Sequence, residues 1–144
     1  MRKILLAASA VGLFLVFNAC SKSSSGPSNA KTVANLSGSY NLTALTGSVL
    51  GVNINLYDSL APCDRDNIIQ LDTNGIAQFI DAGIACVPPS DSTGAWSLSS
   101  NTDTIYVDGS ANFIKSWDGK TLVLTSSADY NGFPATLATT LVKK

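Results

Sequence analysis

The sequence predicts an all-β domain, built as a small antiparallel up-and-down β-barrel of about eight to nine strands. From about residue 33 onward, short runs of Val, Ile, Leu, Thr and aromatic residues alternate with clusters of Gly, Asn, Asp and Ser. This pattern is typical of strands joined by turns. No stretch of the sequence has a sustained helical period with caps. Short turns make neighbouring strands antiparallel, and closure into a barrel removes the exposed edges.

The turn residues place the expected strands in order along the chain. The strands are expected at residues 38–46, 50–57, 67–72, 76–81, 94–99, 103–108, 111–117, 120–127 and 134–142. The segment 47–62 stays open between two alternatives. Val52, Ile54 and Leu56 alternate with polar residues, which favours a strand, and a loop or a short helical turn is the alternative.

One hairpin is specific enough to predict a register. Asn74-Gly75 is a strong hairpin signal, because both residue types tolerate a positive φ. A two-residue loop would pair Thr73 with Ile76, whereas a longer loop with a glycine bulge would pair Asp72 with Ile76. We prefer the longer loop, because a half-buried sheet needs one apolar face. It places Ile69, Leu71, Ala77 and Phe79 on one face and Gln70 opposite Gln78 on the other.

The first twenty residues read as a secretory signal. A positive start at Arg2 and Lys3 precedes an apolar run from Ile4 to Phe17, which is too short for a membrane span of about 20 residues. Phe17-Asn18-Ala19-Cys20 resembles the bacterial lipobox, with Phe17 in place of the usual leucine. The resemblance implies cleavage before Cys20 and lipidation of its thiol. An ordinary signal peptide that leaves a free thiol is the alternative.

The three cysteines support this interpretation. If Cys20 carries lipid, Cys63 and Cys86 remain, and two cysteines can form a disulfide in an oxidising compartment. Either register of the predicted hairpin brings them close together at its open end, which makes a disulfide geometrically plausible. A pair of buried free thiols is the alternative.

These features divide the chain into three parts. Residues 1–19 are the expected lipoprotein signal peptide, residues 20–32 the lipidated cysteine with a flexible linker, and residues 33–144 the barrel domain. Ser21 to Lys31 contains no large apolar residue and cannot bury enough surface to fold. Without the signal peptide, seven basic residues face ten aspartates. This mildly acidic composition, which has no basic run, argues against nucleic acid as a partner.

The residue types predict that the protein is not an enzyme. The chain contains no histidine and no glutamate, which excludes Ser-His and Cys-His pairs. Two cysteines without a further Cys or His pair are too few ligands for zinc. Asp64 with Asp66, or Asp72 with Asn74, could suggest a calcium loop, but these residues are typical of turns. We therefore expect no catalytic residue, no metal site and no cofactor.

Several short motifs resemble the lipocalin-like domains that are common in secreted lipoproteins of the Bacteroidetes. The motifs are Leu36-Ser37-Gly38-Ser39-Tyr40-Asn41-Leu42, Cys63-Asp64-Arg65-Asp66-Asn67, Leu71-Asp72-Thr73-Asn74-Gly75, Cys86, Gly94-Ala95-Trp96-Ser97-Leu98 and Leu122-Val123-Leu124. The resemblance covers most of residues 34–144. Tyr40 stands where tryptophan is commoner, and the piece between Tyr40 and Cys63 is longer. The resemblance implies a small antiparallel barrel and allows for a small apolar ligand. It implies no catalytic residue.

Five aromatic residues are the candidate ligand-binding residues: Tyr40, Phe79, Trp96, Phe113 and Trp117. In one hypothesis they line a cavity for a small apolar molecule that the protein holds or carries. In the other they fill a solid barrel, and the protein is a structural or partner-binding envelope lipoprotein. An eight-stranded barrel is just wide enough for either, and the short domain favours filling. An apolar cavity with a few polar groups would favour the ligand.

The residues after Cys20 predict where the domain lies. An aspartate directly after the lipidated cysteine would resemble an inner-membrane retention signal. This sequence has Ser21 there, which favours the outer membrane. Ser21-Lys22-Ser23-Ser24 also lacks the acidic residues that resemble a surface-export signal in Bacteroidetes. We therefore expect a lipid-anchored domain that faces the periplasm.

Overall fold

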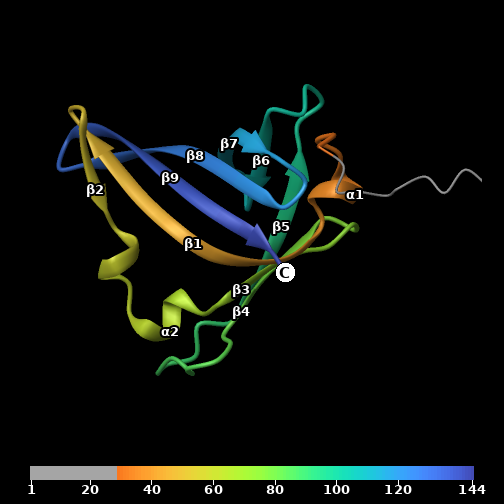
Figure 1. Ribbon diagram of the computed structural model, residues 1–144, viewed down its shortest axis with the longest axis horizontal. Coiled ribbons are helices and arrows are strands. Elements are labelled where there is room, and N and C mark those ends of the chain that lie inside the picture. Colours follow the sequence, from red (N-terminus) through yellow and green to blue (C-terminus); the bar gives the residue numbers. More distant parts are fainter. Residues whose placement is uncertain (1–28) are drawn as a thin grey trace, which may run out of the picture.

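The computed structural model describes residues 29–144, and this part of the chain is nearly all β-structure (Figure 1). The strands are β1 (Gly38–Val49), β2 (Val52–Asn55), β3 (Ile68–Leu71), β4 (Ile76–Ile80), β5 (Ser92–Leu98), β6 (Thr104–Val107), β7 (Ser110–Trp117), β8 (Thr121–Tyr130) and β9 (Phe133–Lys143). Two short helices, α1 (Val33–Leu36) and α2 (Pro62–Arg65), and one 3₁₀ turn, η1 (Tyr57–Ser59), complete the described residues. The predicted all-β class is confirmed.

Eight of the nine strands close into an antiparallel barrel. The order around it is β1-β3-β4-β5-β6-β7-β8-β9, and β9 returns to β1. β2 lies outside this ring, which corrects the expectation that the segment after β1 continues the meander. β1 has 12 residues, so its first part pairs with β3 and its last part, from Thr46, pairs with β2. The structure matches a small lipocalin-like barrel with one extra strand.

The predicted hairpin is β3–β4, and it has the longer-loop register. Gln70 lies opposite Gln78, and the amide N–H of Asp72 donates to the carbonyl of Ile76 at 2.8 Å. Gly75 has φ +85°, a conformation that glycine adopts without strain. Both glutamine side chains donate to the carboxylate of Asp72, each at 2.9 Å. The polar face is therefore tied together outside the barrel, and the apolar face is left for the interior.

Two β-bulges change which residues of a strand face the interior. In β1 the pairing with β9 shifts between Leu42 and Ala44, so the inward positions change from even to odd numbers. In β7 the pairing with β8 shifts between Ile114 and Ser116. A bulge adds one unpaired residue, which turns every later side chain to the opposite face. Strict alternation read from the sequence therefore fails beyond Thr43 and Lys115.

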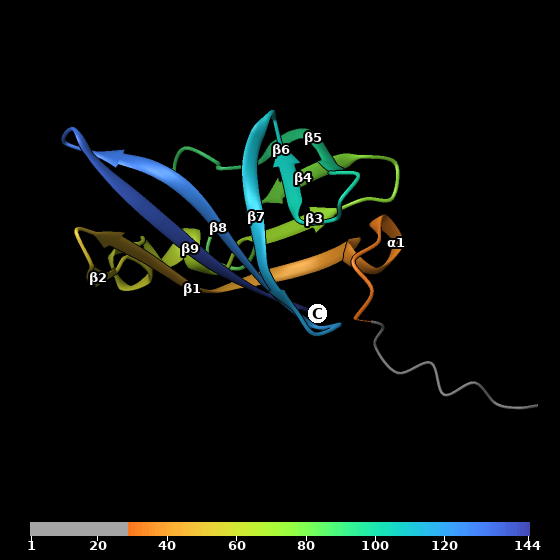
Figure 2. The same ribbon diagram turned by 90° about the horizontal axis from the view of Figure 1, so that it is seen from above.

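Three long strands run past the barrel and form a sheet of four with β2. We call this sheet the extension; it comprises β2 and residues 45–49 of β1, 125–130 of β8 and 133–138 of β9. Its projection from the barrel is visible at the left of Figures 1 and 2. β8 leaves β7 after Thr125, and beyond that point its described pairing is with β9 alone. Among the described residues, no further strand pairs with either edge of the extension.

The two ends of the barrel differ. We call base the end with α1, the β3–β4, β5–β6 and β7–β8 turns and the C-terminus, and mouth the opposite end. At the base, Leu36 of α1 and Tyr40 of β1 are fully buried, and the hydroxyl of Tyr40 donates to the carbonyl of Leu36 at 2.6 Å. The core there also includes Trp96, Trp117 and Leu122. The helix α1 therefore closes the base.

Candidate functional site

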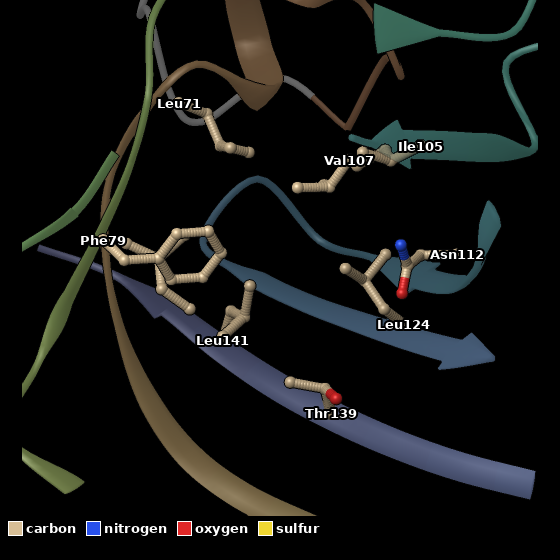
Figure 3. A pocket seen from close by; sticks show the side chains of 9 residues that line it. Leu71, Phe79, Ile105, Val107, Asn112, Leu124, Thr139 and Leu141 are labelled. Carbon is tan, nitrogen blue, oxygen red and sulfur yellow. The ribbon is translucent and has the colours of Figure 1, made fainter. Parts of the chain in front are cut away.

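The barrel interior above the base holds an apolar pocket of about 160 Å³. Figure 3 shows side chains from several strands pointing into the same space. The lining residues are Ile69, Leu71, Phe79, Ile105, Val107, Asn112, Leu124, Thr139 and Leu141. We call this space the central pocket. It exists because the large aromatic residues that fill the barrel are concentrated at the base.

The lining of the central pocket contains no charged side chain. Its polar groups are the amide of Asn112 and the hydroxyl of Thr139, which lie on β7 and β9. The side-chain amide of Asn112 donates to the carbonyl of Ser110 at 3.0 Å, which fixes its orientation. Apolar walls with a few polar groups are the usual composition of a small-molecule site. This lining suits an apolar chain or ring.

The size of the central pocket decides between a filled and a hollow barrel. A water molecule occupies about 30 Å³ of liquid, and an apolar cavity of about 150 Å³ can hold a benzene-sized molecule. The central pocket is about 160 Å³, well above one water molecule. Drug-sized ligands occupy about 300–1,000 Å³. The barrel is therefore solid at its base and hollow above it, with room for a slender apolar group.

Of the five candidate aromatic residues, Phe79 lines the central pocket. Tyr40, Trp96 and Trp117 instead fill the core at the base, where each is at most 8% exposed. Tyr40 donates to Leu36, and the indole N–H of Trp96 donates to the carbonyl of Asp72 at 2.8 Å. Each of these two polar atoms is paired with backbone, so both rings are fixed in structural positions.

Phe113 requires a correction, because its side chain is 52% exposed and lies outside the central pocket. Phe113 and Trp117 are four residues apart, and a regular strand would place them on one face. The β7 bulge at Lys115 separates them. Asn112 and Ile114 face inward before the bulge, and Trp117 faces inward after it. Phe113 therefore lies on the outer face.

The sequence did not identify the aliphatic lining residues or the two polar ones, Asn112 and Thr139. Most of the central pocket is lined by Ile, Leu and Val side chains from four strands, β3, β6, β8 and β9. In the sequence these residues have the same signal as core residues, namely alternation with polar neighbours. Only the spacing of facing strands distinguishes a residue that lines a cavity from one that fills it. Ile69, Leu71 and Phe79 share the face that the predicted register gave them.

A second hollow lies along the inner face of the extension. Its volume is about 250 Å³. It is lined by Gly47, Val49, Ile54, Leu56, Ala128, Asp129, Tyr130, Ala135 and Leu137. We call it the outer trough. Ala135 and Leu137 are followed on the same face of β9 by Thr139 and Leu141 of the central pocket. The inner face of β9 therefore forms one wall shared by the two hollows, apolar except for the hydroxyl of Thr139.

The disulfide predicted from the cysteine count is present at the mouth. Cys63 and Cys86 are bonded, with their Cα atoms 5.3 Å apart. The bond ties α2 to the long segment between β4 and β5. The carboxylate of Asp64 lies with the two sulfurs in a group whose atoms are all within 4.8 Å. Sulfur atoms in a disulfide are not thiolates, so this group lacks the ligands that zinc takes from cysteine.

The expected lipidation site, Cys20, lies outside the described residues, as do the signal peptide and most of the linker. Among residues 29–144, no helix has the length and apolar character needed to cross a membrane. No protein-family model matches the chain, and neither a curated protein nor a solved structure matches it.

Proposed function

We propose that the chain is a lipocalin-like lipoprotein of the cell envelope, anchored by lipid on Cys20, whose barrel binds a small apolar ligand in the central pocket. The observation that carries this proposal is the hollow above the base. Burial of apolar surface stabilises a complex by about 25 cal/mol per Å². A protein that gains nothing from the hollow would be more stable with it filled, because cavities destabilise folded proteins.

The proposed anchor rests on the sequence around Cys20. Two or more acyl chains hold a protein stably at a membrane, whereas one gives marginal binding. The domain would then face the periplasm from the outer membrane, in the oxidising environment that a disulfide requires. Mass spectrometry of the protein purified from its own envelope tests the anchor. The expected mass lacks residues 1–19 and carries acyl groups on Cys20, and an unmodified Cys20 contradicts the proposal.

A separate experiment tests which side of the outer membrane the domain faces. Protease added to intact cells should leave the domain uncut, and the same protease added after the outer membrane is opened should remove it. Cleavage in intact cells would place the domain on the cell surface instead.

The pocket is tested with the chain from residue 20 onward, made soluble by Cys20→Ser. N-phenyl-1-naphthylamine is a suitable neutral reporter, because its fluorescence rises in apolar surroundings. Thr139→Phe would fill the central pocket and should weaken reporter binding by about tenfold or more, since the lost space cannot be recovered in a packed barrel.

The matched control is Thr140→Phe, on the opposite face of the same strand and equally half-buried. It should bind the reporter as the parent does. If the parent shows no binding, or both variants bind equally well, the alternative holds: a structural or partner-binding envelope lipoprotein that works through its surface.

A further inference from the structure

The charged residues of the barrel are divided unequally between its two ends. Seven of the ten aspartates lie in segments at the mouth end: Asp58, Asp64, Asp66, Asp81, Asp91, Asp108 and Asp129. The one basic residue in those segments is Arg65. Lys31, Lys120, Lys143 and Lys144 lie at the base. The mouth therefore has a strongly negative net charge, while the charges at the base nearly cancel.

Arg65 offsets one of these seven negative charges, and its described contacts are not with an aspartate. Its Nε donates to the carbonyl of Leu60 at 3.1 Å, and its guanidinium lies 6.0 Å from the centre of the Tyr57 ring. Within the two hollows themselves, Asp129 is the single charged lining residue. Clefts lined by one sign of charge between apolar walls focus the electric field on what enters them. A negative group entering the outer trough would be repelled, and a positive group attracted.

The shape of the two hollows indicates a long, thin ligand. Leu141, Thr139, Leu137 and Ala135 are alternate residues on the inner face of β9, with the first two in the central pocket and the last two in the outer trough. Six residues of extended strand span about 20 Å. Apolar side chains continue to the tip, where Tyr130 and Phe133 are 58% and 49% exposed.

We propose that the central pocket and the outer trough together bind a single-chain amphiphile with a positively charged head group. The alkyl chain of the ligand lies along β9 with its end in the central pocket. The charged head group lies at the tip of the extension beside Asp129. This assignment rests on the proposed ligand-binding function and adds the charge and length of the ligand to it. It disfavours long-chain carboxylates, whose head would lie beside the negative charge of Asp129.

The head group is tested with three ligands of equal chain length, each below its micelle-forming concentration: dodecyltrimethylammonium, dodecanol and dodecanoate. Each displaces N-phenyl-1-naphthylamine from the soluble Cys20→Ser protein. We expect the cationic ligand to bind about tenfold more tightly than the carboxylate, with the alcohol between them. The preference should shrink at 0.5 M salt, where exposed charges are screened within about 4 Å. Equal affinities, or tighter binding of dodecanoate, would overturn the assignment.

Paired charge variants assign the preference to the mouth. Asp108→Asn with Asp129→Asn removes two mouth charges and keeps the side-chain oxygens that accept from Ala95 and Gly132. Asp103→Asn with Asp118→Asn removes two charges at the base. Both proteins have the same net charge. The mouth variant should lose several-fold of the preference for the cationic ligand, and the base variant should keep it. An equal loss in both would mean a non-specific charge effect and would contradict the proposal.

Substitutions at two alanines of the extension test where the alkyl chain of the ligand binds. Ala128 lines the outer trough, whereas Ala138 of β9 lies on the outer face, and both are half-buried. Ala128→Trp should weaken binding of dodecyltrimethylammonium about tenfold or more, because six methylene groups lose their apolar contact. Binding of hexyltrimethylammonium, whose chain fits the central pocket, should be unchanged. Ala138→Trp should change neither.

The outcomes separate this inference from the proposed function. Suppose that the reporter binds and Thr139→Phe prevents its binding, but that affinity depends neither on the charge of the head group nor on Ala128→Trp. The proposed pocket function then stands, and the amphiphile assignment fails. If light scattering gives a dimer that Ala128→Trp converts to a monomer, with ligand affinity unchanged, the outer trough is instead a contact between two copies. In that case too the assignment is overturned.

Discussion

The base of the barrel and the extension use the same three strands, β1, β8 and β9, but differ sharply in how far their side chains are buried. At the base, the inner face of β8 holds Leu122, which is fully buried under α1 and the aromatic core. Near the tip of the extension, Leu50 is 74% exposed and Val52 is 63% exposed. β9 pairs with β1 and β8 through both regions, with one bulge in β1 between Leu42 and Ala44. The comparison shows that strand pairing forms the sheet in both regions, while the residues that cover its inner face decide whether a region is buried core or stays exposed.

The largest difference is expected for matched leucines. Leu122→Ala removes a side chain with no exposure and should lower the free energy of unfolding by about 2–5 kcal/mol. Leu50→Ala should change it by less than about 0.5 kcal/mol, because an exposed surface residue loses little contact. Urea denaturation of both variants, with unchanged slopes, measures the difference. An equal loss of unfolding free energy in the two variants would show that Leu50 is packed against other residues, and would contradict the difference between base and extension.

The disulfide is the next largest effect, because it holds the mouth without a large core. Replacing Cys63 and Cys86 by serine opens a connection of 23 residues and should lower the free energy of unfolding by about 3 kcal/mol. Reduction of the parent protein should give the same value. Near-ultraviolet circular dichroism of Trp96 and Trp117 should be unchanged, since both lie at the base. A lost tryptophan signal would mean that the two ends fold as one unit.

Tyr40→Phe tests the base with a smaller change. It removes the hydrogen bond to Leu36 and should cost about 1 kcal/mol at neutral pH. Burial raises the pKa of Tyr40 from 10.0 to about 12, so the unfolded chain releases this proton first. The stability from a protonated Tyr40 is thus complete below pH 10 and is lost as the pH rises towards 12.

The measurement is the unfolding free energy of parent and Tyr40→Phe proteins between pH 9 and pH 12. The parent's advantage should shrink over this range, because phenylalanine does not titrate. A constant difference would show that the Tyr40 hydroxyl is not withdrawn from water.

The smallest effect is expected in the two glycine turns that end β7 and β8. At the base, the backbone N–H groups of Thr121 and Lys120 donate to Asp118 and lower the pKa of its carboxyl below the usual 3.8. The stability from this charge is present above pH 3.8 and is lost as the pH falls through the lowered pKa of Asp118. At the tip, Asp129 accepts from the N–H of Gly132. Carboxyl NMR titration should give Asp118 a pKa below 3.8, and a value at or above 3.8 would contradict the turn geometry.

Much of the fold follows from local patterns. Turn residues placed eight of the nine strands, and the Asp72–Gly75 turn with its apolar flanks predicted the register of β3 and β4. The ninth strand, β2, lies in the segment 47–62, for which the sequence left a strand and a loop or helical turn as alternatives. The cysteine count predicted the Cys63–Cys86 bond. The position of β2 outside the ring was not predictable, because β1 pairs with β3 and β2 along the same edge. Short-range patterns record turns and faces, and they do not record which distant strands meet.

The candidate site divides in the same way. The sequence indicated the bulky aromatic residues, and the structure places three of them in the core, Phe79 in the central pocket and Phe113 outside. The bulge at Lys115 explains the last, since one added residue reverses the alternation. The walls of the pocket are aliphatic residues that no sequence pattern separates from the core.

The all-β class, the approximate places of the strands, the hairpin register and the disulfide pair were predictable from the sequence, because each depends on neighbouring residues or on a count. The strand ends were not, since β1 and β8 run to Val49 and Tyr130, beyond their expected ends at residues 46 and 127. The sequence also shows the negative charge, but not that seven of the ten aspartates lie in segments at the mouth end. Tertiary structure alone decided the hollow above the base, the shared wall of the two pockets and the face of each residue beyond a bulge. These depend on the distances between strands that are remote in sequence, and only closure of the barrel sets those distances.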